Sequence, residues 1–192
     1  MRFKQEATPW ARGLLLAALM MAPGGAVPAA ATDRNALSGE MKVLEAVINE
    51  ALGQTFALPF GLLEKAEGTY LPEFGVVFSL EVNLSPARVP SMFNPRPPSK
   101  EELERGRKID KERLEAIRQT VPRLLADHAA GLHEITPDQY VAVAVHLFTL
   151  PQGDEKLPSQ LVWEVKKSDL NQYWDRKISY AELEKSIKLS EL

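Results

Sequence analysis

The chain has 192 residues, which is enough for one domain with a substantial core. Its 45% hydrophobic and 26% charged residues are typical of a globular protein. The formal net charge of −3 provides no basic excess to neutralise phosphates, which argues against a nucleic-acid-binding protein. The absence of cysteine excludes disulfides, thiolate metal sites and a lipoprotein anchor.

Residues 1–31 have the three parts of a secretory signal peptide. Basic residues precede the apolar run 13–22, and the small residues of 26–31 follow it. This run is shorter than the ~20 residues that a membrane-spanning helix needs, although an uncleaved N-terminal anchor is the alternative. We therefore expect cleavage near Ala31, export to the periplasm or the extracellular space, and a mature chain without stable membrane insertion.

The mature chain is predicted to begin with an amphipathic helix. Apolar residues recur at three- and four-residue steps through 37–52. Ser38 is a suitable N-cap residue, and Gly53 is a suitable terminator. Proline and glycine interrupt the next stretch, 54–66, which we interpret as an apolar connector with room for one helical turn.

The clearest strand signal in the chain is the stretch 70–84, YLPEFGVVFSLEVNL. A Pro-Glu-Phe-Gly turn opens it, and apolar residues then alternate with other residues. This alternation predicts a strand with one buried face and one more polar face. The residues of the buried face are Val76, Phe78, Leu80, Val82 and Leu84.

The next segment, 85–98, contains five prolines, which exclude a regular helix or strand interior and predict an extended surface loop. After this loop, Ser99 and Glu102 form a capping-box pattern that starts a long, highly charged helix. Its charges are typical of a solvated face with ion pairs between successive turns. Pro122 predicts a kink in this helix, or a new helix start.

Two further strands are predicted after this helix. The stretch 140–150 is apolar on both faces, which is typical of a central strand. The stretch 160–167 alternates, and the loop between the two contains proline, glycine and aspartate, so the pair is predicted to be a hairpin. Two short helices follow, and Ser168 is a suitable cap for the first of them.

The predicted order of elements is α-β-α-β-β-α, with one more short helix at the end. Two strands that a long helix connects are expected to be parallel if they are neighbours, and the hairpin adds an antiparallel strand. We therefore predict an α+β fold, a two-layer sandwich in which a small three-stranded mixed sheet packs on helices. The face under the helices is predicted to carry Val76, Phe78, Val143, Val145 and Trp163.

Three stretches together resemble a family of exported bacterial proteins without a known function. They are YLPEFGVVFSLEVNL at 70–84, YVAVAV at 140–145 and LVWEVKKSDLNQYWDRKISYAELEKSI at 161–187. The resemblance covers most of the mature chain. It implies export and a single domain over 32–192, and it implies no activity, ligand or catalytic residue.

The sequence lacks the common patterns of serine hydrolases, zinc proteases, P-loop proteins and dinucleotide-binding proteins. If the apolar faces of the strands align, Glu81, His146 and Glu164 all lie on the opposite face. Such a cluster of two carboxylates and an imidazole is suited to metal binding or acid–base catalysis. The simpler interpretation places both glutamates in solvent and gives His146 one local hydrogen bond.

The tail 168–190, predicted to be a helical hairpin, also matches part of a calcium-binding loop. With Asn171 as position one, Asp175 falls at position five and Glu182 at position twelve. Positions three and six lack the expected ligand and the expected glycine. The alternative is that Ser179 and Glu182 form a second capping box within the hairpin.

Our leading hypothesis is an exported, non-enzymatic accessory protein that contacts a protein partner in the cell envelope. Its candidate contact residues are Met92 and Phe93 in the proline-rich loop and Tyr173 and Trp174 in the tail, for which packing in the core is the alternative. The other hypotheses are a small metal-assisted hydrolase and an envelope module that binds a glycan or a lipid. We predict no cofactor and no nucleic-acid partner.

Overall fold

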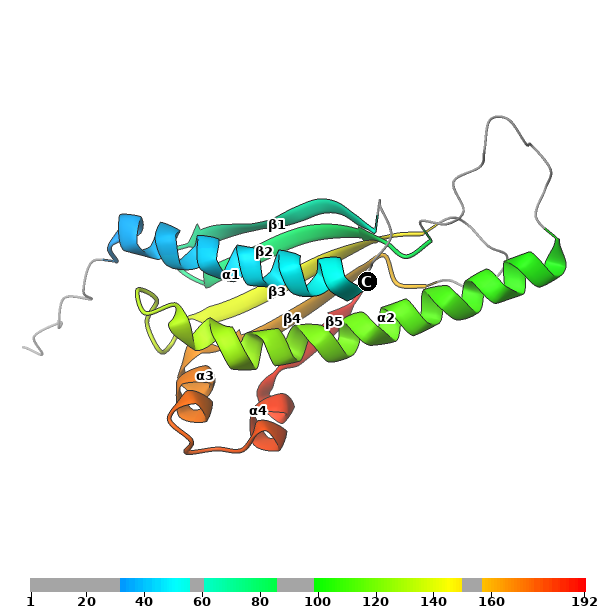
Figure 1. The fold of residues 1–192 in the computed structure, drawn as a ribbon. Coiled ribbons are helices and arrows are strands. Elements are labelled where there is room, and N and C mark those ends of the chain that lie inside the picture. Colours follow the sequence, from blue (N-terminus) through cyan, green and yellow to red (C-terminus); the bar gives the residue numbers. More distant parts are fainter. Residues whose placement is uncertain (1–31, 56–60, 86–98, 150–156) are drawn as a thin grey trace, which may run out of the picture. The chain divides into compact units, whose positions relative to one another are not determined.

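A five-stranded sheet is the centre of the structure, a computed structural model that describes residues 32–55, 61–85, 99–149 and 157–192 (Figure 1). Residues 32–192 form one compact unit. The elements follow in the order α1 (Arg34–Thr55), β1 (Leu62–Leu71), β2 (Gly75–Asn83), α2 (Lys100–His128), the 3-10 turn η2 (Ala129–Gly131), β3 (Tyr140–Phe148), β4 (Gln160–Lys166), α3 (Lys167–Trp174), α4 (Tyr180–Ser186) and β5 (Lys188–Glu191).

The strands lie in the sheet in their order along the chain, from β1 to β5. β2 and β3 are parallel neighbours, and every other pair is antiparallel. This confirms the α+β class, the mixed sheet, the parallel pair joined through a long helix, and the β3–β4 hairpin. The prediction of three strands in the order α-β-α-β-β-α is wrong, because β1 and β5 form the two edges of the sheet.

Strand β1 begins at Leu62, inside the stretch 54–66 that was predicted to be a connector, and the sequence pattern did not reveal it. Most β1 side chains are exposed, and the pairing with β2 contains two register shifts, so hydrophobic alternation is weak. Side chains of α1 bind the free edge of this strand. The side-chain oxygen of Asn49 accepts a hydrogen bond from the backbone N–H of Ala66 at 2.7 Å, and Glu45 accepts one from Gly68 at 2.8 Å.

The other edge strand, β5, lies in the tail that was predicted to be a helical hairpin over 168–190. Only α3 and α4 are helical there, and the four exposed residues of β5 pair with β4. Arg118 of α2 holds this strand, since its Nε and Nη2 lie 3.1 and 2.8 Å from one carboxylate oxygen of Glu191. An exposed strand of four residues has no periodicity that distinguishes it from a helix end.

Both predicted capping boxes are confirmed. The Ser99 N–H donates to the Glu102 carboxylate at 2.7 Å, and the Glu102 N–H donates to the Ser99 hydroxyl at 3.2 Å. Ser179 and Glu182 form the same pair of reciprocal hydrogen bonds at the start of α4. Each box saturates N–H groups that the first turn of a helix leaves without a partner.

Two other predicted helix starts are wrong. Ser38 lies inside α1, whose first turn is capped instead by Asp33, which accepts hydrogen bonds from the backbone N–H groups of residues 35 and 36. Ser168 lies inside α3, where Lys166 is the N-cap residue and forms no side-chain cap. A serine shows only that the residue type at that position suits an N-cap. Where the helix begins is decided by its packing on the sheet.

α2 continues through Pro122, so the predicted new helix start at this residue is wrong. Proline removes one helical hydrogen bond and crowds the preceding turn. The buried side chains of Ile117, Val121 and Leu125 lie on both sides of it and hold the helix against the sheet. Tertiary packing therefore offsets the local cost of proline.

α1 and α2 lie side by side over one face of the sheet (Figure 1). A row of buried side chains, Phe78, Val143 and Trp163, crosses β2, β3 and β4 beneath them, and each is at most 1% exposed. The predicted buried face is thus confirmed. We call the opposite side of the sheet the outer face, and no helix or strand among the described residues covers it.

Candidate protein-binding surface

The segment from α3 to α4 is a helical hairpin that packs on α2. Leu170 of α3 and Leu183 of α4 are fully buried and connect the hairpin to the core. Arg123 of α2 places its guanidinium carbon 3.4 Å from the centre of the Tyr180 ring, and Tyr173 meets the same ring edge-on at 6.2 Å. These cation–π and aromatic contacts fix both helices of the hairpin relative to α2.

The turn of the hairpin contains a residue in an unusual backbone conformation. Arg176 has a φ of 60°, in the left-handed region where glycine or asparagine is expected after a helix. Hydrogen bonds hold this conformation, since the N–H of Arg176 donates to the carbonyl of Tyr173 and the N–H of Lys177 donates to that of Gln172, both at 2.9 Å. A strained residue of this kind is a reason to examine the surface around it for function.

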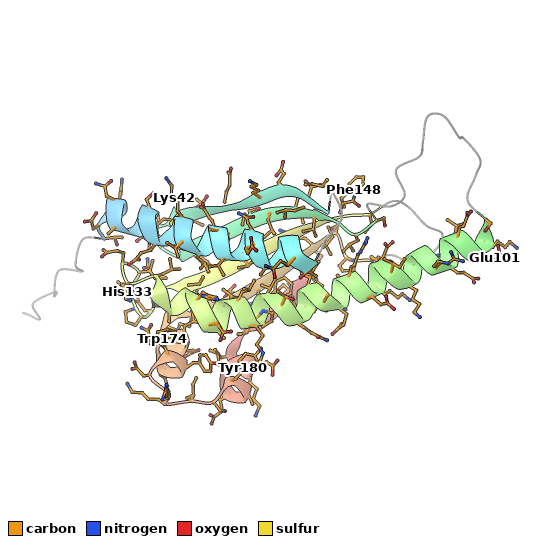
Figure 2. All side chains as sticks on the ribbon, in the orientation of Figure 1. Lys42, Glu101, His133, Phe148, Trp174 and Tyr180 are labelled. Carbon is orange, nitrogen blue, oxygen red and sulfur yellow. The ribbon has the colours of Figure 1, made fainter. Side chains whose placement is uncertain are left out.

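A surface groove of about 680 Å³ lies beside this turn, between the end of α2 and the hairpin. Trp174, the last residue of α3, is 65% exposed at the groove (Figure 2). Such exposure of an indole presents apolar area that a partner can cover. The residues that line the groove are Asp127, Tyr173, Trp174, Arg176, Lys177, Ile178 and Ser179.

The charges at the groove are only partly neutralised. Lys177 pairs with Asp175 at 2.9 Å. The guanidinium of Arg176 forms neither an ion pair nor a hydrogen bond with any residue in the described part of the chain. An exposed tryptophan and an unneutralised arginine therefore lie within one groove, and these two residue types are enriched at the energetic centres of protein interfaces.

The three residues predicted as a catalytic or metal cluster do not converge. Glu81 and His146 are direct neighbours on β2 and β3, on the outer face as expected. Glu164 lies opposite Ala142, which is four residues or about 13 Å along β3 from His146. Over the residues that the structure describes, no group of three histidine, aspartate or glutamate side chains is arranged to hold a metal ion.

The three residues of the predicted calcium loop take part in three separate local interactions. Asn171 accepts a hydrogen bond from the Lys167 ammonium at 2.7 Å. Asp175 pairs with Lys177, and Glu182 belongs to the capping box of α4. The capped helical hairpin therefore accounts for the same residues.

Lys167 is a buried ionisable residue that the sequence did not indicate, since nothing distinguishes it from the adjacent Lys166. Its side chain is 2% exposed and donates to the carbonyl of Ala130 and to Asn171, both at 2.7 Å. Burial lowers the pKa of its ammonium to about 8, and the nearby Glu40 charge opposes that shift. With these bonds, the amine joins the start of α3 to η2.

The remaining candidates lie outside the described residues: Met92 and Phe93, with the rest of the proline-rich loop from residue 86, and the signal peptide 1–31. Within the described ranges, no helix is both long and apolar enough to cross a membrane. No protein-family model, curated protein or solved structure matches this chain.

Proposed function

We propose that this chain is an exported, non-enzymatic binding protein that holds a protein partner in the groove beside Trp174. The exposed indole next to the unneutralised Arg176, on a hairpin that Arg123 fixes to α2, is the observation that carries this proposal. Export rests on the signal-peptide pattern of 1–31.

The groove indicates the chemistry of the partner. Trp174 offers a flat apolar surface, and Arg176 offers a planar cation that binds carboxylates through two parallel hydrogen bonds. We infer that the partner contributes an extended or helical segment with an apolar side chain over the indole and an aspartate or glutamate beside Arg176. The fixed hairpin favours binding, because little conformational entropy is lost when the partner docks.

A photo-crosslinking amino acid in place of Trp174, introduced in cells that produce the protein, tests this proposal. We expect one discrete protein adduct. The matched control carries the same crosslinker in place of Val43, which is 67% exposed on α1, outside the groove. Equal adducts at both positions, or no adduct at position 174, would contradict the proposal.

The adduct also identifies the partner, which can then be purified separately for quantitative binding measurements. Trp174→Ala should weaken binding by roughly 30-fold or more, which is the effect of a central interface residue. Arg176→Glu should weaken it further than the neutral Arg176→Gln, because the partner carboxylate then meets a like charge. Lys42→Glu, which reverses an exposed charge on α1, should leave the affinity unchanged (Figure 2).

Export of the protein is tested by a separate measurement, the identity of the N-terminal residue. The N-terminus of the protein recovered from the cell envelope or the medium, read by mass spectrometry, should begin within a few residues of Thr32. A chain that keeps residues 1–31 and remains inside the cell would exclude this part of the proposal without affecting the groove.

A further inference from the structure

The two edges of the sheet differ in how their backbone groups are satisfied. The free edge of β1 is covered by α1, whose Asn49 and Glu45 side chains accept hydrogen bonds from the N–H groups of Ala66 and Gly68. β5 forms the opposite edge, and all four of its residues are exposed (Figure 1). A sheet edge that stays open presents backbone donors and acceptors with which another extended chain can pair.

The register of β5 on β4 shows which of its backbone groups point outward. The N–H of Leu192 donates to the carbonyl of Gln160 at 3.0 Å, and the N–H of Gln160 donates back at 3.3 Å. Such hydrogen-bonded pairs occur at every second residue of an antiparallel ladder, so Ser190 also bonds β4, while Leu189 and Glu191 point away from it. The N–H and carbonyl groups of Leu189 and Glu191 have no hydrogen-bonding partner among the described residues.

The side chains of β5 determine which kind of strand fits this edge. Leu189 lies opposite the buried Trp163, on the helix side of the sheet, and is 39% exposed. Lys188 and Ser190 lie on the outer face. Glu164 is the neighbour of Lys188 on β4, but the Lys188 ammonium forms no ion pair with a residue in the described ranges. The edge therefore offers an apolar contact on one side of the strand and a positive charge on the other.

We propose that β5 binds a short extended segment of a protein partner, which adds to the five-stranded sheet as one more antiparallel strand. About four backbone hydrogen bonds can form in this arrangement, through the outward groups of Leu189 and Glu191. An apolar side chain of the segment covers Leu189, and an aspartate or glutamate lies opposite Lys188. Because β5 is short, the pairing is limited to a few residues, and the charge opposite Lys188 decides which segments bind.

This binding edge is separate from the groove at Trp174. None of the residues that line the groove belongs to β5, and Leu189 and Lys188 take no part in it. The proposal for β5 goes beyond the proposed function, and each of the two can fail without the other. A Leu189→Pro variant should therefore still give the crosslinked adduct at position 174.

An NMR titration of the purified protein with a synthetic peptide tests the proposal for β5. The probe is a capped peptide of about eight residues that alternates threonine and valine, with one glutamate placed to face Lys188. Because a few exposed hydrogen bonds give weak binding, we expect a dissociation constant between about 0.1 and 5 mM. The amide signals of Leu189 and Glu191 should shift most and exchange with solvent more slowly. The amide of Ser190, which already pairs with β4, should change less.

Two variants of β5 separate backbone pairing from charge. Leu189→Pro removes an outward N–H and leaves the bonds to β4 in place, so peptide binding should weaken at least about tenfold, and circular dichroism shows whether the fold is retained. Lys188→Glu should weaken binding of the glutamate peptide several-fold and strengthen binding of the same peptide with lysine in place of the glutamate. Lys42→Glu on α1 is the control and should leave both affinities unchanged.

The proposal is overturned if the amides of Leu189 and Glu191 do not shift at up to about 10 mM peptide. Equal binding by a folded Leu189→Pro variant overturns it as well, and so does a peptide preference that Lys188→Glu leaves unchanged. Slow exchange of the Leu189 and Glu191 amides in the protein without peptide has the same consequence, because another part of the chain or a second copy would then already cover this edge.

Discussion

A Cβ atom on Gly75 would lie 2.1 Å from the carbonyl oxygen of Tyr140. The two residues are direct partners at the start of the parallel pair β2–β3, and the N–H of Tyr140 donates to the carbonyl of Phe74 at 2.8 Å. The rings of Phe74 and Tyr140 stack with their centres 5.6 Å apart. Gly75 also has a φ of 129°, so both the space and the backbone require glycine at this position.

Gly75→Ala should therefore lower the free energy of unfolding by roughly 2–4 kcal/mol, because the strands must separate to admit the methyl group. The matched control is Gly39→Ala in α1, where an added Cβ meets no atom within 4 Å. There the same change should raise stability by about 0.5–1 kcal/mol through helix propensity. Urea denaturation of both variants measures the contrast, and effects of the same sign would contradict this account of Gly75.

The bonds from α1 to the edge of β1 give a second prediction. Asn49→Ala leaves the N–H of Ala66 without its protein acceptor and should cost about 1–2 kcal/mol. Amide exchange at Ala66 should become faster, while exchange in β3 changes only with global stability. Gln54→Ala, which removes an exposed hydrogen bond to Glu50 in the same helix, is the control and should have little effect.

Lys167 gives a prediction on pH. Its pKa is lowered from 10.5 to about 8 in the folded chain, mainly by burial. Between these two values the unfolded chain binds more protons than the folded chain, so this residue makes stability rise with pH from about 8 to 10.5. Below that window Lys167 is charged in both states and its desolvation opposes folding.

The variant Lys167→Met removes the titrating group and keeps the length of the side chain. The stability difference between wild type and variant should move in favour of the wild type as the pH rises through this window. Urea denaturation at several pH values between about 7 and 10.5 measures the difference. A constant difference over that range would show that the Lys167 pKa is not shifted.

We predict that Arg176 lowers the free energy of unfolding and at the same time contributes to binding of the protein partner. Arg176→Gly should raise the free energy of unfolding by about 0.5–1 kcal/mol, because glycine adopts a φ of 60° without steric cost. This variant should also bind the partner identified by crosslinking more weakly, since the guanidinium is lost. Arg176→Lys keeps the Cβ and the charge, so its melting temperature should match the wild type. A less stable glycine variant would mean that the Arg176 side chain has a structural role.

Much of the centre of the sheet was predictable from local patterns. The sequence pattern identified β2 and β3, through the alternation of 76–84 and the run of 140–148 that is apolar on both faces. It did so because each buried face of a strand carries apolar residues at every second position. Both capping boxes were also predictable, since a serine and a glutamate three residues apart make their contacts within one turn. The groove was predictable only in part, through Tyr173 and Trp174.

Other features arise only from contacts between distant residues. The edge strands β1 and β5 carry little apolar pattern of their own and are held by side chains of α1 and α2. The neighbours of Lys167 come from η2 and α3, and the stack on Tyr180 requires Arg123 from α2.

The sequence by itself determined on which face of the sheet each strand residue lies, and only the tertiary structure decided at which level along the sheet it lies. Glu81, His146 and Glu164 share the outer face as alternation predicted, yet Glu164 is displaced along the sheet from the other two. The physical reason is the two-residue repeat of a strand. A shift in pairing by two residues keeps every side chain on its face and changes all of its neighbours, so pairing register is set by contacts across the fold.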